Sequence, residues 1–191
     1  MRFLSTNVPG VSVLEPERHG DARGYFARTW CARELTDHGL DPSLSQCSVS
    51  FNHRRATLRG LHYQLPPHAE VKLVRCIRGA LLDVAVDLRP DSTTFGQHHA
   101  EELSAENGRA LYIPRGFAHG FYTLADATEV EYFISVPHHP ESARGLRHDD
   151  PLLRIRWPGP VEVISPRDAG YPPARREDFQ PLRGLLESRA S

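Results

Sequence analysis

His62, Lys72 and Tyr132 each lie within a short apolar stretch of the sequence that has the composition of a β-strand. A charged or titratable side chain is costly in such surroundings and is retained there mainly when it has a function. A histidine can accept a proton at neutral pH, a tyrosine can donate one, and a fixed ammonium can stabilise an enolate. The three side chains are therefore suited to removing a proton from a carbon next to a ketone and returning it.

Strand alternation predicts that these side chains point inward. Lys72 shares a strand face with Val74 and Cys76, and Tyr132 shares one with Val130, because alternate residues of a strand point the same way. The alternative for Lys72 is a surface lysine whose stem covers apolar area while its ammonium stays in water.

Arg59 lies three residues before His62, so a regular strand would place the two side chains on opposite faces. A β-bulge at Gly60 would turn both inward, and glycine is common at bulges. Arg59 is also close to Arg54 and Arg55, and such a cluster can bind a phosphate group. We therefore predict a bulge at Gly60 and a substrate-binding role for Arg59.

Two aspartates are candidates for orienting His62 and stabilising its imidazolium. Asp168 lies in a Ser-Pro-Arg-Asp segment, where an exposed turn aspartate is equally expected. Asp83 shares a strand face with Leu81 and Ala85 and is the second candidate. Taken alone, His62 would more often be a hydrogen-bonded core histidine, and its neighbours shift the interpretation toward catalysis.

The composition of the chain excludes several classes of protein. The 191 residues carry a net charge of -1 and three cysteines, so there is no general attraction to nucleic acid or to an anionic membrane. An odd number of cysteines without C-x-x-C spacing predicts neither a disulfide framework nor a zinc knuckle. No apolar run reaches the length of a signal peptide or a membrane span. A cytoplasmic protein is predicted.

Short strand-like runs separated by glycine, proline and Asn or Asp turns extend over residues 46–164. The runs at 71–77 and 81–88 follow one another directly and predict a hairpin. Many short strands at regular spacing predict an all-β barrel or jelly roll.

Helical patterning is weak and confined to the periphery, at residues 31–38 and 182–188. A chain of this length suits one domain. We expect a single domain over residues 1–191, with the barrel core at about 46–164 and a C-terminal tail at about 170–191.

Gly108, Pro114, Gly116 and His119 have the spacing of the second cupin motif, G-x5-P-x-G-x2-H. A strand enters a tight turn there, and the histidine that follows faces the interior of the barrel. The first cupin motif uses H-x-H and a later glutamate to bind a metal, but the corresponding segment supplies only His62. The sequence therefore predicts a cupin-type jelly-roll barrel that does not hold a metal tightly.

The sequence resembles the dTDP-4-dehydrorhamnose 3,5-epimerases, a family of metal-free cupins that act on nucleotide sugars. The resemblance runs over almost the whole chain in several blocks that keep their order. These blocks are residues 21–26, 58–64, 72–74, 83–89, 94–96, 113–121, 150–151 and 157–158. The resemblance implies an isomerase without a cofactor, since the substrate ketone supplies the electron sink. It also implies a homodimer in which Arg23 and Phe26 cross into the neighbouring chain's pocket.

The resemblance assigns a role to each chemical residue. His62 falls at the position of the general base, Tyr132 at that of the proton donor, Asp168 at that of the histidine's partner, and Lys72 beside the sugar carbonyl. A larger set is expected to bind the nucleotide-diphosphate sugar. This set is Arg23, Phe26, Arg28, Gln46, Ser48, Arg59, Asp83, His119, His138 and Arg167.

Four positions depart from the family pattern. Arg28 replaces a glutamate, Arg167 replaces a lysine, and Ser48 replaces the asparagine of a Q-x-N contact. His138 stands where a tyrosine stacks on the thymine ring. All four positions belong to nucleotide binding, so the resemblance supports the chemistry more strongly than the identity of the base.

The leading hypothesis is conversion of dTDP-4-dehydro-6-deoxy-D-glucose to dTDP-4-dehydro-L-rhamnose. The alternative is a single-centre 3- or 5-epimerase of a dTDP- or CDP-4-keto-deoxyhexose, in an antibiotic or surface-sugar pathway. A metal-dependent cupin oxygenase is disfavoured because H-x-H is missing. A non-catalytic sugar-binding cupin is disfavoured because the acid, the base and the lysine are all present.

Overall fold

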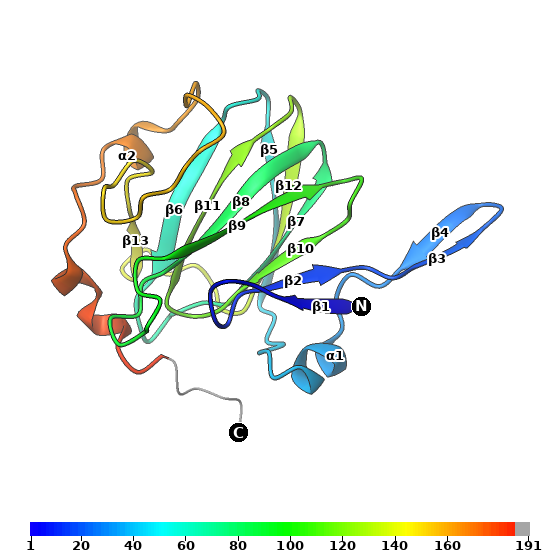
Figure 1. Ribbon diagram of the computed structural model, residues 1–191, viewed down its shortest axis with the longest axis horizontal. Coiled ribbons are helices and arrows are strands. Elements are labelled where there is room, and N and C mark those ends of the chain that lie inside the picture. Colours follow the sequence, from blue (N-terminus) through cyan, green and yellow to red (C-terminus); the bar gives the residue numbers. More distant parts are fainter. Residues whose placement is uncertain (186–191) are drawn as a thin grey trace.

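The computed structural model describes residues 1–185, and their strands form two antiparallel sheets and a separate hairpin (Figure 1). The six-stranded sheet contains, in spatial order, β1 (Arg2–Ser5), β2 (Ser12–Glu15), β10 (Ala110–Ile113), β7 (Lys72–Arg78), β12 (Thr128–Ile134) and β5 (Gln46–Asn52). The five-stranded sheet contains β13 (Ala143–Gly145), β6 (Leu58–Gln64), β11 (Phe117–Thr123), β8 (Ala80–Asp87) and β9 (His98–Ser104). The hairpin is formed by β3 (Arg18–Asp21) and β4 (Gly24–Ala27). The prediction of an all-β fold is confirmed.

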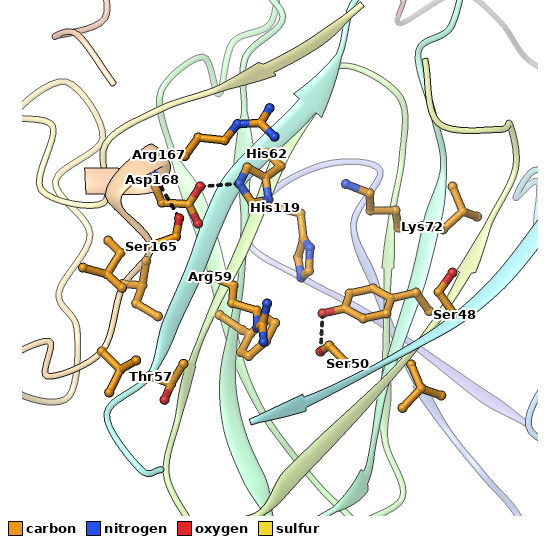
Figure 2. A pocket seen from close by; sticks show the side chains of 17 residues that line it. Ser48, Ser50, Thr57, Arg59, His62, Lys72, His119, Ser165, Arg167 and Asp168 are labelled. Atoms are coloured by element: carbon orange, nitrogen blue, oxygen red, sulfur yellow. Dashed lines mark hydrogen bonds and ion pairs between the residues drawn. The ribbon is translucent and has the colours of Figure 1, made fainter. Parts of the chain in front are cut away.

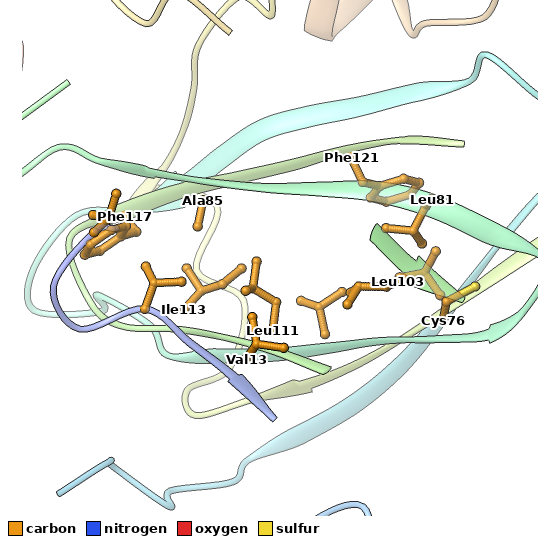
Figure 3. Close-up of a cluster of buried hydrophobic side chains, with 13 residues drawn as sticks. Val13, Cys76, Leu81, Ala85, Leu103, Leu111, Ile113, Phe117 and Phe121 are labelled. Atoms are coloured by element: carbon orange, nitrogen blue, oxygen red, sulfur yellow. The ribbon is translucent and has the colours of Figure 1, made fainter. Parts of the chain in front are cut away.

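The inner faces of the two sheets enclose the main hydrophobic core (Figure 3). Leu111 and Ile113 of β10 contribute from one sheet, and Leu81, Phe117 and Phe121 contribute from the other. Complete burial of one such side chain stabilises the fold by about 1.5–3 kcal/mol. This core fixes the separation of the sheets, and therefore the width of any cavity between them.

A second core covers the outer face of the five-stranded sheet. Val84 and Val86 of β8 pack there with Phe179 and Leu182, which are fully buried. Strand β8 is thus apolar on both faces, which explains its nearly continuous apolar sequence. The C-terminal segment expected as a tail is an integral layer of the fold up to Leu182.

The predicted hairpin between residues 71–77 and 81–88 is wrong. Strand β7 pairs with β10 and β12, whereas β8 pairs with β11 and β9 in the other sheet. The chain changes sheets at Gly79, which has a φ of +76° and lies so close to Thr128 that a Cβ would be 2.6 Å from its Oγ1. A short glycine turn fits a hairpin and a crossing between sheets equally well, so the sequence between the strands could not distinguish them.

The N-terminal strands lie outside the range expected for the barrel. Strands β1 and β2 extend the six-stranded sheet, and Leu14 of β2 is buried. The barrel therefore begins well before residue 46. These strands are only four residues long, so their alternation is too short to stand out in the sequence.

Helices are short and peripheral, as predicted. They are α1 (Ala32–Asp37), α2 (Pro166–Ala169) and the 3-10 helix η1 (Arg176–Leu182). Helix α1 matches the range 31–38. Of the expected range 182–188, Leu182 ends η1, residues 183–185 form a turn, and the remainder lies outside the described residues. Across residues 1–185, the structure contains no helix of the length and apolarity that crossing a membrane requires.

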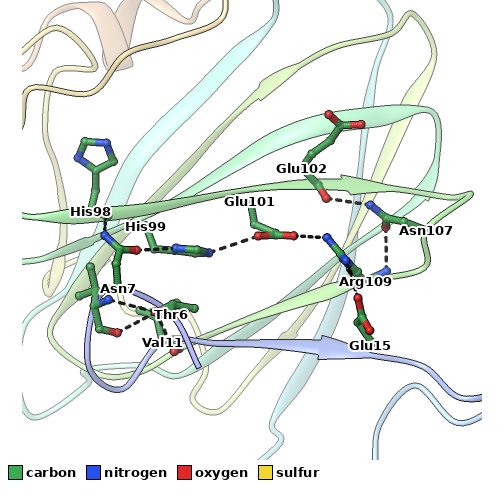
Figure 4. Close-up of polar contacts among 11 residues, drawn as sticks. Thr6, Asn7, Val11, Glu15, His98, His99, Glu101, Glu102, Asn107 and Arg109 are labelled. Carbon is green, nitrogen blue, oxygen red and sulfur yellow. Dashed lines mark hydrogen bonds and ion pairs between the residues drawn. The ribbon is translucent and has the colours of Figure 1, made fainter. Parts of the chain in front are cut away.

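A polar network joins the two sheets along one edge of the molecule (Figure 4). The Arg109 guanidinium donates to Glu15 on β2 through Nε (2.8 Å) and to Glu101 on β9 through Nη1 (2.8 Å). His99, also on β9, shares a hydrogen bond of 2.7 Å with Asn7. This edge is closed, and the main cavity lies toward the other edge, where β5 and β6 border it.

Candidate active site

A cavity of about 660 Å³ lies between the sheets and brings most of the predicted chemical residues together (Figure 2). His62 and Arg59 reach it from β6, Lys72 from β7 and Tyr132 from β12. Asp168 reaches it from helix α2. Ser48, His119 and Arg167 also line it. Residues far apart in the sequence therefore converge on one space.

A bulge in β6 places both Arg59 and His62 at this cavity. His62 is paired with His119 of β11, while Arg59 is paired with Phe121, so three steps along β6 match two along β11. Gly60 has a φ of +114°, and a Cβ there would lie 2.6 Å from the backbone of β11. Only glycine fits such a close approach. The predicted bulge at Gly60 is confirmed.

His62 and Asp168 form a hydrogen-bonded pair, with 2.8 Å between Nε2 and Oδ1. The other carboxylate oxygen of Asp168 accepts a bond of 3.1 Å from the Gly60 N–H, and the Asp168 N–H donates to Ser165 Oγ at 3.0 Å. Ser165 is the N-cap of α2, so the cap of this short helix fixes the aspartate. The structure confirms that Asp168 reaches His62.

Burial raises the pKa of the Asp168 carboxyl, but its hydrogen bonds to His62 and Gly60 outweigh burial and hold that pKa below the ordinary value. Asp168 is therefore a carboxylate at neutral pH. A carboxylate at Nε2 favours the tautomer with its proton on Nε2 and leaves Nδ1 of His62 as the acceptor. The His62 side chain is 42% exposed, so this acceptor is accessible to a substrate.

Asp83 does not contact His62, so its assignment as the second candidate partner is wrong. It is fully buried and lies 2.7 Å from His119 Nε2 through Oδ1. It does not line the cavity, so it is not placed to touch a substrate either. Alternation along β8 predicted the correct face for Asp83, but the nearest histidine on that face is His119 of the neighbouring strand β11.

Tyr132 reaches the cavity from the sheet opposite to that of His62. Its hydroxyl is 3.1 Å from Ser50 Oγ, and its ring meets the edge of His119 with 6.1 Å between ring centres. Burial raises the pKa of the Tyr132 phenol well above its ordinary value. The phenol is therefore neutral at pH 7 and carries a proton to donate.

Lys72 is buried, with 9% of its surface exposed, which rules out the alternative of a surface lysine. Its ammonium lies 2.7 Å from Glu70 Oε1. Glu70 is not among the residues predicted from the sequence, although its position two residues before Lys72 was a signal. Figure 2 shows Lys72 and the His62–Asp168 pair on facing sides of the cavity.

Cationic and polar groups surround the same space. Arg59 Nε donates to Asn52 Oδ1 at 2.7 Å, and Arg167 Nε donates to the Tyr171 hydroxyl at 2.8 Å. Neither guanidinium forms an ion pair among the described residues, so both charges are available to an anion.

A smaller hollow of about 200 Å³ adjoins the cavity and shares His62, Lys72 and Arg167 with it. Gln46 and His138 line this hollow, and the His138 N–H donates to Gln46 Oε1 at 3.0 Å. The structure thus brings together two residues that the sequence suggested for nucleotide binding.

Arg23, Phe26 and Arg28 are not brought to the cavity of their own chain. Arg23 and Phe26 lie on the β3–β4 hairpin, which projects from the body of the molecule (Figure 1). Phe26 is 73% exposed, and Arg28 pairs with Glu34. The predicted role of Arg23 and Phe26 in a neighbouring chain's pocket and the predicted substrate-binding role of Arg28 stay predictions.

The cavity does not offer a set of metal ligands. Its two histidines each direct Nε2 at a carboxylate. Among residues 1–185, the one group of three side chains that could hold an ion is His68, His139 and Glu141, outside the cavity. The two rings of this group stack 3.5 Å apart, so their in-plane lone pairs run side by side and do not converge on one point.

The fold and the cavity define a cupin-type β barrel whose cavity is lined by a histidine, a lysine and a tyrosine. The family model for dTDP-4-dehydrorhamnose 3,5-epimerase matches residues 5–176. The enzyme of that name from Sinorhizobium fredii is 43% identical over 173 residues, covering 90% of this chain and 89% of that protein. The chain belongs to the dTDP-4-dehydrorhamnose 3,5-epimerase family and is an isomerase.

Solved structures of relatives superimpose on this fold. The Bacillus anthracis dTDP-4-dehydrorhamnose 3,5-epimerase, crystallised with TDP and PPi bound, gives a TM-score of 0.86 at 38% identity and covers 90% of this chain and 98% of its own. ChmJ, a 3'-monoepimerase from Streptomyces bikiniensis in complex with dTDP-quinovose, gives a TM-score of 0.84 at 32% identity, covering 94% and 92%.

Proposed function

We propose that the chain converts dTDP-4-dehydro-6-deoxy-D-glucose to dTDP-4-dehydro-L-rhamnose by inverting carbons 3 and 5. The observation that carries this proposal is the placement of a base and an acid on opposite walls of one cavity. His62 comes from the five-stranded sheet and Tyr132 from the six-stranded sheet. A sugar ring held between them presents one face to each.

The first step is removal of the proton alpha to the carbon 4 ketone. Nδ1 of His62 takes the proton, and the electrons of the broken C–H bond move to form the enolate. Asp168 stabilises the imidazolium that results, because its carboxylate lies 2.8 Å from Nε2. The Lys72 ammonium, which lines the same cavity, stabilises the negative charge on the enolate oxygen.

The second step returns a proton to the other face of the same carbon. The Tyr132 hydroxyl donates, the C–H bond forms and the ketone is restored. Burial raises the pKa of the phenol, so the phenolate is costly and regains its proton from solvent as His62 loses its own. Repetition at the second carbon completes the double inversion.

Substrate binding is assigned to the cations and polar groups around the cavity. Arg59 and Arg167 suit the diphosphate, since a guanidinium binds phosphate oxygens in pairs. Gln46 and His138 suit the nucleoside in the adjoining hollow. The TDP and PPi bound to the Bacillus anthracis relative support a nucleoside diphosphate as the carrier.

A homodimer is part of the same proposal. The projecting hairpin exposes Tyr25 and Phe26 to 60% and 73%, an apolar area that a second copy would cover, as the sequence resemblance implies. Arg23 and Arg28 would then serve the partner's pocket. Sedimentation analysis of the wild type and of Phe26→Ser tests the dimer.

The three free cysteines support a cytoplasmic location.

A single-centre epimerase is the second candidate. The observation that favours it is the structural match to ChmJ, a 3'-monoepimerase. The two candidates use the same base, acid and lysine and differ only in how the ring is held.

Proton NMR of dTDP-4-keto-6-deoxyglucose in deuterium oxide separates the two candidates. Deuterium at carbons 3 and 5 together with the rhamnose-series product supports the double epimerase. Deuterium at one carbon supports the single-centre enzyme. Absence of exchange at both carbons would overturn the proposed function.

A further inference from the structure

A carboxylate stands beside the lysine that the proposed mechanism places at the ketone. Glu70 Oε1 lies 2.7 Å from Lys72 Nζ, and the two side chains are only 12% and 11% exposed. Within the described residues this is the one ion pair formed by Lys72. Both side chains line the hollow that adjoins the main cavity.

Glu70 is itself held in place by a buried amide. Gln64 Nε2 donates to the second oxygen of Glu70, Oε2, at 3.0 Å and also to the His68 carbonyl at 3.1 Å. Gln64 Oε1 accepts from the His139 N–H at 2.7 Å. Because Gln64 is bonded at both ends and is 4% exposed, its amide is held in one orientation, in which Nε2 donates to Glu70 and to the His68 carbonyl.

The pair has an electrostatic and a geometric consequence for the lysine. A buried ammonium without a counter-ion is costly, so it would lose its charge or turn toward water. A lysine stem is also long and flexible, and it needs a contact to hold its Nζ at one point. Lys72 lines both the cavity and the adjoining hollow, whereas Glu70 lines only the hollow, so the contact with Glu70 holds the ammonium at the boundary between the two.

We propose that Glu70, fixed by Gln64, is the positioning residue for Lys72, keeping the ammonium charged and aimed at the enolate oxygen. This inference rests on the proposed function, in which Lys72 stabilises the enolate. Glu70 does not line the main cavity, so it acts through Lys72 and does not touch the reacting sugar carbons.

The test is Glu70→Gln, which keeps the shape of the side chain and an oxygen for Gln64 but removes the charge. We expect kcat for deuterium exchange at both carbons to fall about 10- to 100-fold, which is less than the 10²- to 10³-fold loss on removing a transition-state donor outright, because the ammonium itself remains. The Kd for dTDP should change less than kcat, because the proposed mechanism places the Lys72 ammonium at the sugar ketone, although Glu70 and Lys72 also border the hollow assigned to the nucleoside.

Glu131→Gln is the matched control. Glu131 pairs with Arg75 at 3.3 Å in the same sheet but does not line the cavity. The Glu131→Gln variant loses the same charge from the same kind of ion pair, and its kcat should remain at the wild-type value.

Gln64→Met provides a second way to weaken the Glu70–Lys72 contact if Glu70→Gln fails to fold. It removes the donor to Glu70 while leaving the carboxylate, so kcat should fall in the same direction and by less. Wild-type or increased kcat in either folded variant would overturn the positioning role. A loss of kcat accompanied by an equal loss of dTDP affinity would overturn it as well.

Lys72→Met, measured in parallel, separates this inference from the function on which it rests. If Lys72→Met keeps wild-type kcat, the role of the lysine in the proposed mechanism fails. If Lys72→Met loses activity while Glu70→Gln does not, the mechanism stands and the positioning role of Glu70 fails.

Discussion

Two histidine–aspartate pairs lie side by side, with both histidines in the five-stranded sheet, and they differ in exposure and in the origin of the aspartate. His62 and His119 are directly paired across β6 and β11. Each directs Nε2 at an aspartate, at 2.8 Å to Asp168 and at 2.7 Å to Asp83. The His62 side chain is 42% exposed, while that of His119 is 6% exposed.

The origin of each aspartate explains the difference. Asp83 belongs to the sheet itself and is fully buried, so His119 is enclosed between its own strand and its neighbours. Asp168 comes from a helix outside the sheet, and it holds His62 at a bulge where the ring borders the cavity. The His62–Asp168 pair is thus suited to proton transfer, whereas the His119–Asp83 pair is suited to shaping the wall of the cavity.

The largest expected contrast comes from removing each imidazole in turn. His62→Ala should lower kcat for deuterium exchange about 10³-fold, as expected for loss of a general base, with little change in the Kd for dTDP. His119→Ala should lower kcat less and lower the melting temperature more, because it opens a cavity in a buried position. NMR exchange and thermal unfolding measure the two effects. A larger loss of kcat in His119→Ala than in His62→Ala would contradict this distinction between the two pairs.

Replacing each aspartate by asparagine tests the same difference between the two histidine–aspartate pairs. Asp168→Asn should lower kcat about 10²-fold, because the amide no longer fixes the tautomer or stabilises the imidazolium. Asp83→Asn should leave kcat within about threefold and lower the free energy of unfolding by about 1–3 kcal/mol. Steady-state kinetics and urea unfolding of the two variants check this. Equal losses of kcat would show that both pairs take part in chemistry.

The pH dependence of stability gives a smaller effect at the same site. The pKa of Asp168 is lowered from its ordinary value of 3.8 in the folded protein. Because the pKa is lowered by folding, the stabilisation is fully present when the pH is above the pKa of the unfolded state. It is lost as the pH falls through the pKa of the folded state. The difference in unfolding free energy between wild type and Asp168→Asn should therefore be constant at neutral pH and shrink below about pH 4. Urea titrations across this range measure it, and a difference that grows in acid would contradict it.

Sequence patterns predicted the site well where they act along one strand. The glycine between Arg59 and His62 indicated the bulge, and alternation around Lys72 and Tyr132 indicated their inward direction. Each of these depends on local geometry, which the order of residues specifies.

Contacts between strands were harder to predict. Asp83 was assigned to the wrong histidine because alternation gives a face and not the neighbouring strand. The hairpin after Gly79 was wrong for the same reason, since a turn does not say which sheet the next strand enters. Glu70 was missed because a carboxylate near a lysine in sequence is usually a solvated pair. Its amide partner Gln64 is fixed by the His139 N–H, a contact from a distant part of the chain.

The central claim is that Tyr132 delivers a proton to the face opposite His62, and the most direct test is deuterium exchange by Tyr132→Phe. The base can still remove a proton and return deuterium on its own side. We expect exchange at the carbons next to the ketone with the original configuration retained and no rhamnose-series product. Inversion by Tyr132→Phe at the wild-type rate would contradict it.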